Sequence, residues 1–254
     1  MEEMGLNQFW NGRKVFVTGI TGFKGSWLSS WLNLLGAEVK GYSLKPEHDE
    51  ALYNLLDVNG FCSTVFGDIR DEENLFSVLD DFQPEIVFHL AAQPLVQKSY
   101  KNPRETYEIN LMGTINLIES ALKIASIKSF INVTSDKVYE NKSWHWGYRE
   151  NERLNGSDPY SNSKSCADLI ANCYRTSFIE EKFNLSNVRS GNVIGGGDWA
   201  QNRLIPDMMR AIISKKKMKI RNPSSTRPWQ HVLEPLYGYI LLAEKMYRSG
   251  KYVG

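Results

Sequence analysis

Val15-Phe16-Val17-Thr18-Gly19-Ile20-Thr21-Gly22-Phe23-Lys24-Gly25 is the stretch that decides the fold of this chain. It opens with an apolar run of strand character, and three glycines then follow at a spacing of three. The apolar residues beyond it recur at helical spacing: Trp27, Leu28, Trp31, Leu32, Leu34 and Leu35. The stretch therefore predicts a strand, a tight glycine turn and a helix.

A turn of this kind suits a nucleotide. Glycines let the backbone lie close to a pyrophosphate, and the first turn of the helix offers unpaired N–H groups and a partial positive charge. Ordinary strand-to-helix turns also contain glycine, so the motif alone is a weak signal. The strand before it and the helix after it favour dinucleotide binding.

The composition excludes several classes of protein. The 254 residues carry 30 Lys plus Arg against 29 Asp plus Glu, so no strong field favours nucleic acid or an anionic membrane as a partner. The first residues lack the pattern of a signal peptide, and no run reaches the ~18 apolar residues of a membrane span. We expect a soluble, cytoplasmic protein.

The cysteines and histidines indicate neither a disulfide nor a metal site. Cys166 and Cys173 are two helical turns apart, roughly 10 Å by helix rise, which is too far for a disulfide. The chain has three cysteines and four scattered histidines, with no Cys-x-x-Cys pair.

The first half of the chain alternates strands with helices. Further strands are expected at 38–44, 64–68, 85–90 and 129–134, and helices around 75–82 and over 103–125. This pattern predicts an α/β fold with a doubly wound parallel sheet, covered by helices on both faces. Ligands of such sheets bind beyond the carboxyl ends of the strands. The cofactor contacts are therefore expected from the glycine turn and from the residues that follow the later strands, namely Gly19, Thr21, Gly22, Phe23, Lys24, Gly25, Asp68, Ile69, Leu90, Ala91, Ala92 and Gln93.

The end of the second strand departs from the usual NAD pattern. It reads Tyr42-Ser43-Leu44, where many NAD-binding folds place an acidic residue for the adenosine ribose. No arginine cluster suits a 2′-phosphate either, so NAD is preferred over NADP rather than deduced. Asp68 has two readings, an acceptor for the adenine amino group or a turn residue.

Tyr160 and Lys164 carry the chemistry expected of the second half. They are four residues apart at the start of a predicted helix, because Pro159 suits its first turn. A neighbouring ammonium favours a phenolate. Lowering a tyrosine pKa from ~10 towards 7 requires about 4 kcal/mol, which Lys164 and a bound nicotinamide would share.

Together these motifs resemble the extended short-chain dehydrogenase/reductases, the family of nucleotide-sugar epimerases and dehydratases. Within that family, four further blocks are similar to the CDP-glucose 4,6-dehydratases: residues 21–28, Thr134-Ser135-Asp136-Lys137-Val138-Tyr139-Glu140-Asn141, residues 189–199 and residues 226–235. The blocks are spread over nearly the whole chain. The resemblance implies NAD-dependent dehydration of CDP-glucose in deoxysugar biosynthesis, such as that of lipopolysaccharide O-antigens.

The resemblance also implies roles for individual residues. Ser135 would hydrogen-bond the sugar O4, Tyr160 would take its proton and Lys164 would support the phenolate. Asp136 would protonate the departing C6 hydroxyl. Lys137 stands where relatives have glutamate, so it either accepts the C5 proton or stabilises the enolate. Asn192, Arg203, Arg227 and His231 would bind the sugar nucleotide.

The same resemblance suggests how the chain is organised. Residues 1–185 would form mainly the NAD-binding domain and residues 186–254 mainly the sugar-nucleotide part, interleaved with the first. Proteins of this family extend beyond residue 254, so we expect the substrate-binding part to be incomplete. A homodimer is implied through the helices near 103–125 and 160–178. The open alternatives are another nucleotide-sugar 4,6-dehydratase, a 4-epimerase, or a non-catalytic dinucleotide-binding module.

Overall fold

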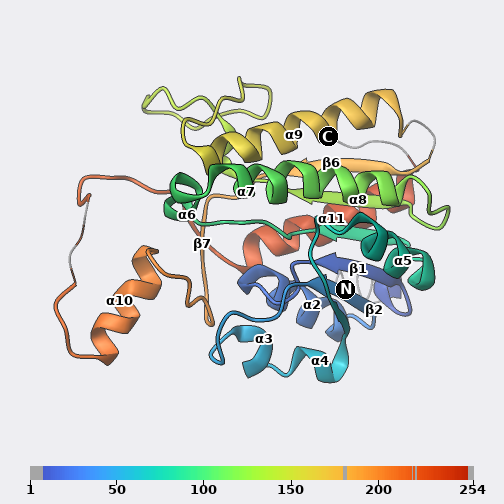
Figure 1. Cartoon of the computed structure of the whole chain (residues 1–254), viewed down its shortest axis with the longest axis horizontal. Helices are drawn as coiled ribbons and strands as arrows, with labels where there is room; N and C mark the ends of the chain where they lie inside the picture. Colours follow the sequence, from blue (N-terminus) through green and yellow to red (C-terminus); the bar gives the residue numbers. More distant parts are fainter. Residues whose placement is uncertain (1–7, 180–181, 219, 221, 251–254) are drawn as a thin grey trace.

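The computed structural model describes residues 8–179, 182–218, 220 and 222–250 (Figure 1). The main strands are β1 (Lys14–Thr18), β2 (Glu38–Ser43), β3 (Ser63–Phe66), β4 (Ile86–His89), β5 (Ser129–Val133) and β6 (Asn184–Val188). The longer helices are α2 (Phe23–Leu34), α5 (Glu72–Phe82), α8 (Gly113–Ala121), α9 (Pro159–Ser177), α10 (Leu204–Ile213) and α11 (Leu233–Ser249). Short helices complete the set: α3 (Leu52–Leu55), α4 (Val58–Phe61), α6 (Val96–Lys101) and α7 (Pro103–Tyr107).

The six strands form one parallel sheet in the order β3-β2-β1-β4-β5-β6. Helices α2 and α11 pack against one another on one face of the sheet, while α5, α8 and α9 cover the other face. Each face has its own apolar core, one including Trp10, Leu28 and Leu236, the other Phe16, Leu79 and Phe130. The predicted doubly wound sheet is confirmed.

The expected helix over 103–125 is interrupted. Its middle is a π-helical segment, η1 (Glu108–Met112), and the last helical segment ends at Ala121. The buried Asn110 lies in this wide turn, where its side chain accepts a hydrogen bond from the Gln93 N–H and donates to the Gln93 carbonyl and Ser163. A polar side chain with several inward partners accounts for the local change of helical pitch.

Helix α9 begins at Pro159, as expected, but it buries a different face from the one its apolar residues suggest. The buried side chains include Ser163, Lys164 and Ala167, whereas Leu169 is 53% exposed. Small and polar residues face the sheet, and Leu169 points away from it.

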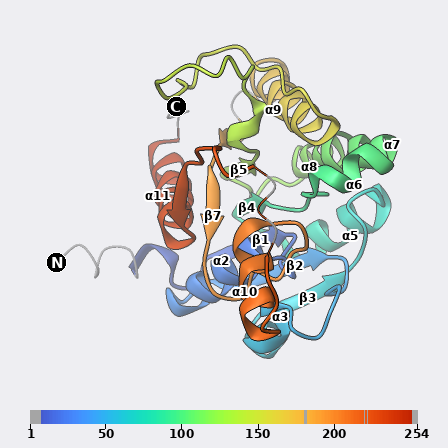
Figure 2. The same ribbon diagram turned by 90° about the vertical axis from the view of Figure 1, so that its left-hand side faces the viewer.

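A second, two-stranded parallel sheet was not predicted. It pairs β7 (Asn192–Ile194) with β8 (Trp229–His231), two segments separated by the α10 region. Figure 2 looks onto the side of the molecule where β7 and α10 lie, in front of the main sheet. The three-residue strands are too short to give a periodic signal.

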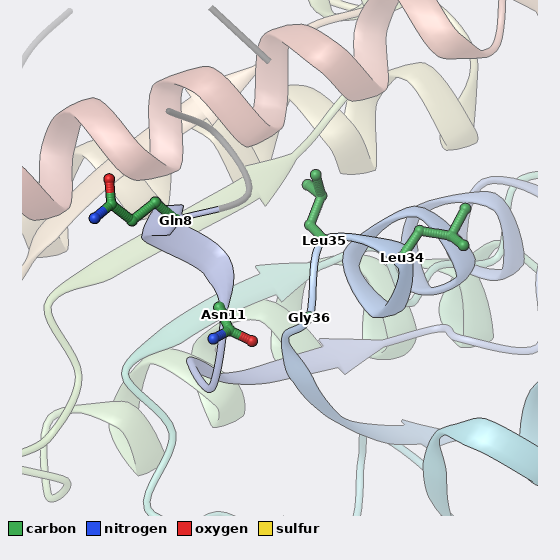
Figure 3. Close-up of a pocket in the computed structure, with 5 residues that line it drawn as sticks. All are labelled: Gln8, Asn11, Leu34, Leu35 and Gly36. Carbon is green, nitrogen blue, oxygen red and sulfur yellow. The ribbon is translucent and has the colours of Figure 1, made fainter. Parts of the chain in front are cut away.

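A shallow pocket lies at the amino end of the main sheet, just before strands β1 and β2 begin (Figure 3). It is lined by Gln8, Asn11, Leu34, Leu35 and Gly36, of which none ionises. Among the described residues, no helix is long and apolar enough to cross a membrane. The expectations drawn from the first five residues and from 251–254 lie outside the described residues.

Candidate active site

The glycine turn joins β1 to α2 at the carboxyl edge of the sheet. Gly19 has φ +72°, and a Cβ there would lie 2.7 Å from the Ala91 nitrogen. A Cβ on Gly25 would lie 2.1 Å from the Gly19 carbonyl oxygen, whereas one on Gly22 would lie 3.3 Å from that oxygen. The fold itself therefore requires Gly19 and Gly25, while the exposed Gly22 borders open space.

The turn fits the diphosphate of a dinucleotide. Gly22 is the N-cap of α2, and within the described part of the chain no side chain caps this helix or places a carboxylate in its first turn. Its first N–H groups are therefore available to an anion. The Lys24 ammonium, which donates to Ser190 Oγ at 3.1 Å, adds positive charge beside the turn.

The end of β2 offers hydroxyl groups in place of a carboxylate. Thr21 Oγ1 lies 2.7 Å from Ser43 Oγ and donates to the Leu44 carbonyl at 3.0 Å. Asp68 is already paired with Arg70, whose guanidinium donates at 3.0 and 2.6 Å. These hydrogen bonds lower the pKa of the Asp68 carboxyl. An adenine amino group would have to share this carboxylate with Arg70.

The other predicted cofactor residues lie at the same edge, but not all present a side chain to it. Ile69 is buried in the core, and Leu90 packs against the opposite core. The Ala91 backbone N–H donates a hydrogen bond to Thr18 Oγ1 at 3.2 Å. Gln93 is 3% exposed, and its side chain is bonded to Thr106 and to the Leu95 N–H. At these positions, and at Ala92, the backbone and the small side chains border the site.

Ser135, Asp136 and Lys137 lie together where β5 ends. Ser135 Oγ lies 3.2 Å from Asp136 Oδ1, and the Lys137 ammonium lies 3.0 Å from the same oxygen. The Asp136 N–H donates to the Ser190 carbonyl at 3.1 Å, which ties the loop to the segment after β6. One carboxylate oxygen thus connects a hydroxyl and an ammonium.

Tyr160 reaches this loop from the first turn of α9, which Asp158 caps through the Ser161 N–H at 3.0 Å. Burial raises the pKa of the Tyr160 phenol. A hydrogen bond with Ser135 and the charge of Arg203 oppose this shift, whereas Asp136 adds to it. The lowered phenol pKa expected from Lys164 does not arise in the protein alone.

Lys164 has a different partner from the one that helical spacing suggests. Its ammonium donates to the Val133 carbonyl at 3.0 Å, and the residue is 4% exposed. Burial, assisted by the charge of Lys24, lowers the pKa of Lys164 to about 7. The fully buried His89 lies near it, between Thr18 and Thr114, and burial lowers the pKa of His89 to about 3. Lys164 therefore titrates near neutrality beside an uncharged imidazole.

The predicted substrate residues come from the second, smaller sheet and from the start of α10. Asn192 donates its backbone N–H to the Pro228 carbonyl, next to the exposed Arg227, and the buried Asn192 Oδ1 lacks a partner among the described residues. Arg203 is paired with Asp198 at 3.0 Å, and its charge acts on Tyr160. His231 lies 6.5 Å from the Trp27 ring, on the α2 side. The structure thus brings the charge of Arg203 near Tyr160 and places Asn192 beside Arg227.

One group at the site was missed by the sequence analysis. Asp168 is 2% exposed, pairs with Arg189 and accepts a hydrogen bond from Thr134, the residue before Ser135. Its position four residues after Lys164, on the same face of α9, was a signal that could have found it.

Comparison with known proteins agrees with this architecture. Residues 16–253 match a family described as GDP-mannose 4,6 dehydratase. The chain is 53% identical over 248 residues to a CDP-glucose 4,6-dehydratase of Salmonella typhimurium, covering 95% of this chain and 69% of that protein. It is 28% identical to a dTDP-D-glucose 4,6-dehydratase of Dictyostelium discoideum, covering 92% of this chain and 56% of that protein.

A solved structure gives the same result for the fold. The dTDP-glucose 4,6-dehydratase of Streptomyces venezuelae, determined with NAD bound, superposes with a TM-score of 0.80 at 25% identity. The match covers 91% of this chain and 72% of that one.

Proposed function

The chain belongs to the GDP-mannose 4,6 dehydratase family, and on that premise we propose that it is the catalytic part of an NAD-dependent hydro-lyase that converts CDP-glucose to CDP-4-dehydro-6-deoxyglucose. The 53% identity to the Salmonella enzyme over 95% of this chain supports the choice of nucleotide sugar. One observation carries the chemistry. Ser135 lies between the two groups: it acts on the phenol of Tyr160, the group for alcohol oxidation, and donates at 3.2 Å to Oδ1 of Asp136, the group for water loss.

Oxidation at C4 uses Tyr160 and Ser135. A C4 hydroxyl placed against both accepts a hydrogen bond from Ser135 and gives its proton to the Tyr160 phenolate. When bound, NAD⁺ would supply hydride acceptance at C4 and hydride return at C6. C5 then regains a proton, which balances the proton that Tyr160 took from O4. The uncapped N-terminus of α2 and the Gly22 backbone would hold its diphosphate, and Lys164 would lie on the nicotinamide side.

Elimination uses the pair formed by Asp136 and Lys137. Proton transfer from Lys137 to Asp136 across their 3.0 Å contact gives a neutral amine and a carboxylic acid. The amine then takes the proton from C5, which the C4 ketone has made acidic, and the acid protonates the C6 hydroxyl as it leaves as water. The pair returns to its ionic form, so the net change is one proton moved from C5 to O6.

The function is tested by product analysis. The full-length protein should be incubated with NAD⁺ and, separately, with CDP-, dTDP-, GDP- and UDP-hexoses. A 4-keto-6-deoxy product found by mass spectrometry only with CDP-glucose would support the proposal. The absence of product with CDP-glucose would refute it, and product with another nucleotide would reassign the substrate.

A homodimer is part of the proposal. Exposed apolar side chains lie along the π-helical segment and α9, with Met112 46%, Leu169 53% and Phe178 58% exposed. Such a row of apolar groups on adjacent helices is suited to the same face of a second copy. Leu169→Glu should give a monomer in light scattering, whereas Leu34→Glu, at an 81% exposed position on α2, should not.

The division of the chain also belongs to the proposal. We assign residues 1–185 mainly to NAD and residues 186–254 mainly to the sugar nucleotide, interleaved because α11 packs against β5, β6 and α2. A cytoplasmic location and a role in lipopolysaccharide O-antigen synthesis complete it. Cell fractionation and deletion of the gene, with analysis of the surface polysaccharide, test these two points.

A further inference from the structure

The carboxylate of Asp168 is surrounded by hydrogen-bond donors from three residues at the ends of two strands, β5 and β6. Oδ1 accepts from Arg189 at 2.8 Å and from Asn187 Nδ2 at 3.0 Å. Oδ2 accepts from Arg189 Nε at 2.9 Å and from Thr134 Oγ1 at 2.9 Å. Asp168 itself is on α9, one helical turn after Lys164. A single buried carboxylate therefore joins α9 to the ends of β5 and β6.

The ion pair of Asp168 with Arg189 also holds both ends of the loop that carries Ser135, Asp136 and Lys137. Thr134 directly precedes Ser135. At the other end, Arg189 donates to the Tyr139 hydroxyl at 2.9 Å and lies over the Tyr139 ring at 5.0 Å. The same guanidinium donates to the Glu150 carbonyl at 2.9 Å, in the segment that leads to α9.

We propose that Asp168 is a positioning residue for the dehydration, which fixes the loop carrying Ser135 and Asp136 relative to the helix carrying Tyr160 and Lys164. Charge-assisted hydrogen bonds to a buried carboxylate are strong and directional, and a buried charge must stay paired. A shift of the loop along α9 would break several of these bonds at once. The alignment of the oxidising and eliminating groups then depends on a residue that touches neither the sugar nor the cofactor.

Asp168 has a second effect, on the charge of Lys164. The groups that interact with Lys164 are Lys24 from α2, His89 from β4 and Asp168 from α9 itself. Burial and Lys24 lower the pKa of Lys164, while Asp168 raises it. Removing the Asp168 charge should therefore move the Lys164 pKa further below about 7.

The first test measures Lys164 without any ligand. The ammonium of Lys164 is titrated by ¹⁵N NMR from about pH 5 to about pH 10, with the signal assigned through Lys164→Arg. Asp168→Asn should lower the midpoint by about half a pH unit or more. Because this variant leaves Arg189 unpaired and is expected to lose stability, the double variant Asp168→Asn/Arg189→Gln is measured as well. The double variant also removes the negative charge of Asp168, but it leaves no buried arginine without its carboxylate.

A matched control comes from the opposite edge of the sheet. Glu85 accepts hydrogen bonds from Arg13 and Tyr247, both at 2.6 Å, so its network resembles that of Asp168. Glu85→Gln should lower the unfolding temperature but leave the Lys164 midpoint unchanged. An unchanged midpoint in both Asp168 variants, or an equal shift in Glu85→Gln, would overturn the electrostatic part of the proposal.

The second test rests on the proposed function. Thr134→Val removes one bond between the loop and Asp168 and leaves the ion pair in place. It should reduce kcat for dehydration by about tenfold with little change in KM, because alignment is lost rather than binding. Wild-type kcat in Thr134→Val would overturn the positioning role. Failure of the wild-type protein to dehydrate CDP-glucose would instead refute the proposed function, and the ligand-free titration distinguishes the two outcomes.

Discussion

Alanine substitutions at two glycines of the same turn should affect different properties: Gly25→Ala the stability of the fold, and Gly22→Ala the affinity for NAD. In Gly25→Ala the new Cβ would lie 2.1 Å from the Gly19 carbonyl oxygen and 2.8 Å from Ile20 Cα. Both neighbours are backbone atoms, so β1 and α2 have to separate. Overpacking of this kind costs about 1–3 kcal/mol or more. For a chain of this size, about 3 kcal/mol corresponds to a loss of roughly 6–12 °C in unfolding temperature.

Gly22→Ala should spare the fold. Gly22 has φ −77° and ψ 166°, a conformation that alanine adopts without strain, and its Cβ would approach the Gly19 oxygen only to 3.3 Å. The gain of about 0.4–1 kcal/mol from the stiffer unfolded chain opposes this tight contact, so the net change should stay within about 1 kcal/mol. A methyl group at the start of α2 should nevertheless keep a diphosphate away from the N–H groups. Loss of one charge-assisted hydrogen bond, about 1.5–3 kcal/mol, predicts NAD binding roughly 10- to 100-fold weaker.

Thermal unfolding and calorimetric NAD titration separate the two effects. The unfolding temperature should fall in Gly25→Ala and stay near wild type in Gly22→Ala, while NAD affinity should fall in Gly22→Ala. Wild-type affinity in Gly22→Ala would refute the assignment of this turn to the diphosphate. Equal destabilisation by both substitutions would refute the division of the glycines between fold and ligand.

Three further predictions concern the catalytic groups. Tyr160→Phe should abolish even transient NADH absorbance with CDP-glucose, and normal transient reduction would contradict its role as the base. Asp136→Asn should still permit reduction of NAD⁺ but slow water loss by at least about 10²-fold, whereas equal loss of both steps would count against Asp136 as the acid. Lys164→Met tests whether the lowered pKa of Lys164 makes stability depend on pH. Between about pH 7 and 10.5 the unfolded state binds a proton at Lys164 that the folded state lacks. The free energy of unfolding of the wild type should therefore rise with pH relative to that of the variant. The difference should grow by about 1 kcal/mol per pH unit from about pH 7 to about pH 9, and denaturant titrations that show no such slope would exclude a neutral buried Lys164.

The sequence predicted the main sheet because its central strands, β1, β4 and β5, are mostly apolar and lie in chain order between helices. The same reasoning does not identify the buried face of α9. Periodicity treats apolar residues as the buried ones, but Ser163, Lys164 and Asp168 face inward because the polar side chains of the site are there. Leu169 is exposed instead. The β7–β8 pairing escaped prediction because its two strands are short and pair across the whole α10 region.

Tyr160 and Lys164 show how far spacing along a helix can specify a site. Their separation of four residues predicted an ammonium beside a phenol, and both groups are indeed at the site. However, Tyr160 is in the first turn of α9 and reaches Ser135, while Lys164 donates to the Val133 carbonyl at the end of β5. The direction of each side chain is set by the strand ends that α9 crosses, which depend on the order of strands in the sheet. The charges that act on Lys164 come in the same way from Lys24 on α2 and from Asp168, one turn further along α9. Local spacing can therefore identify the reactive residues, but their protonation depends on neighbours that the fold brings together. Asp168 is the clearest case, because it pairs with Arg189 beside the loop and also raises the pKa of Lys164.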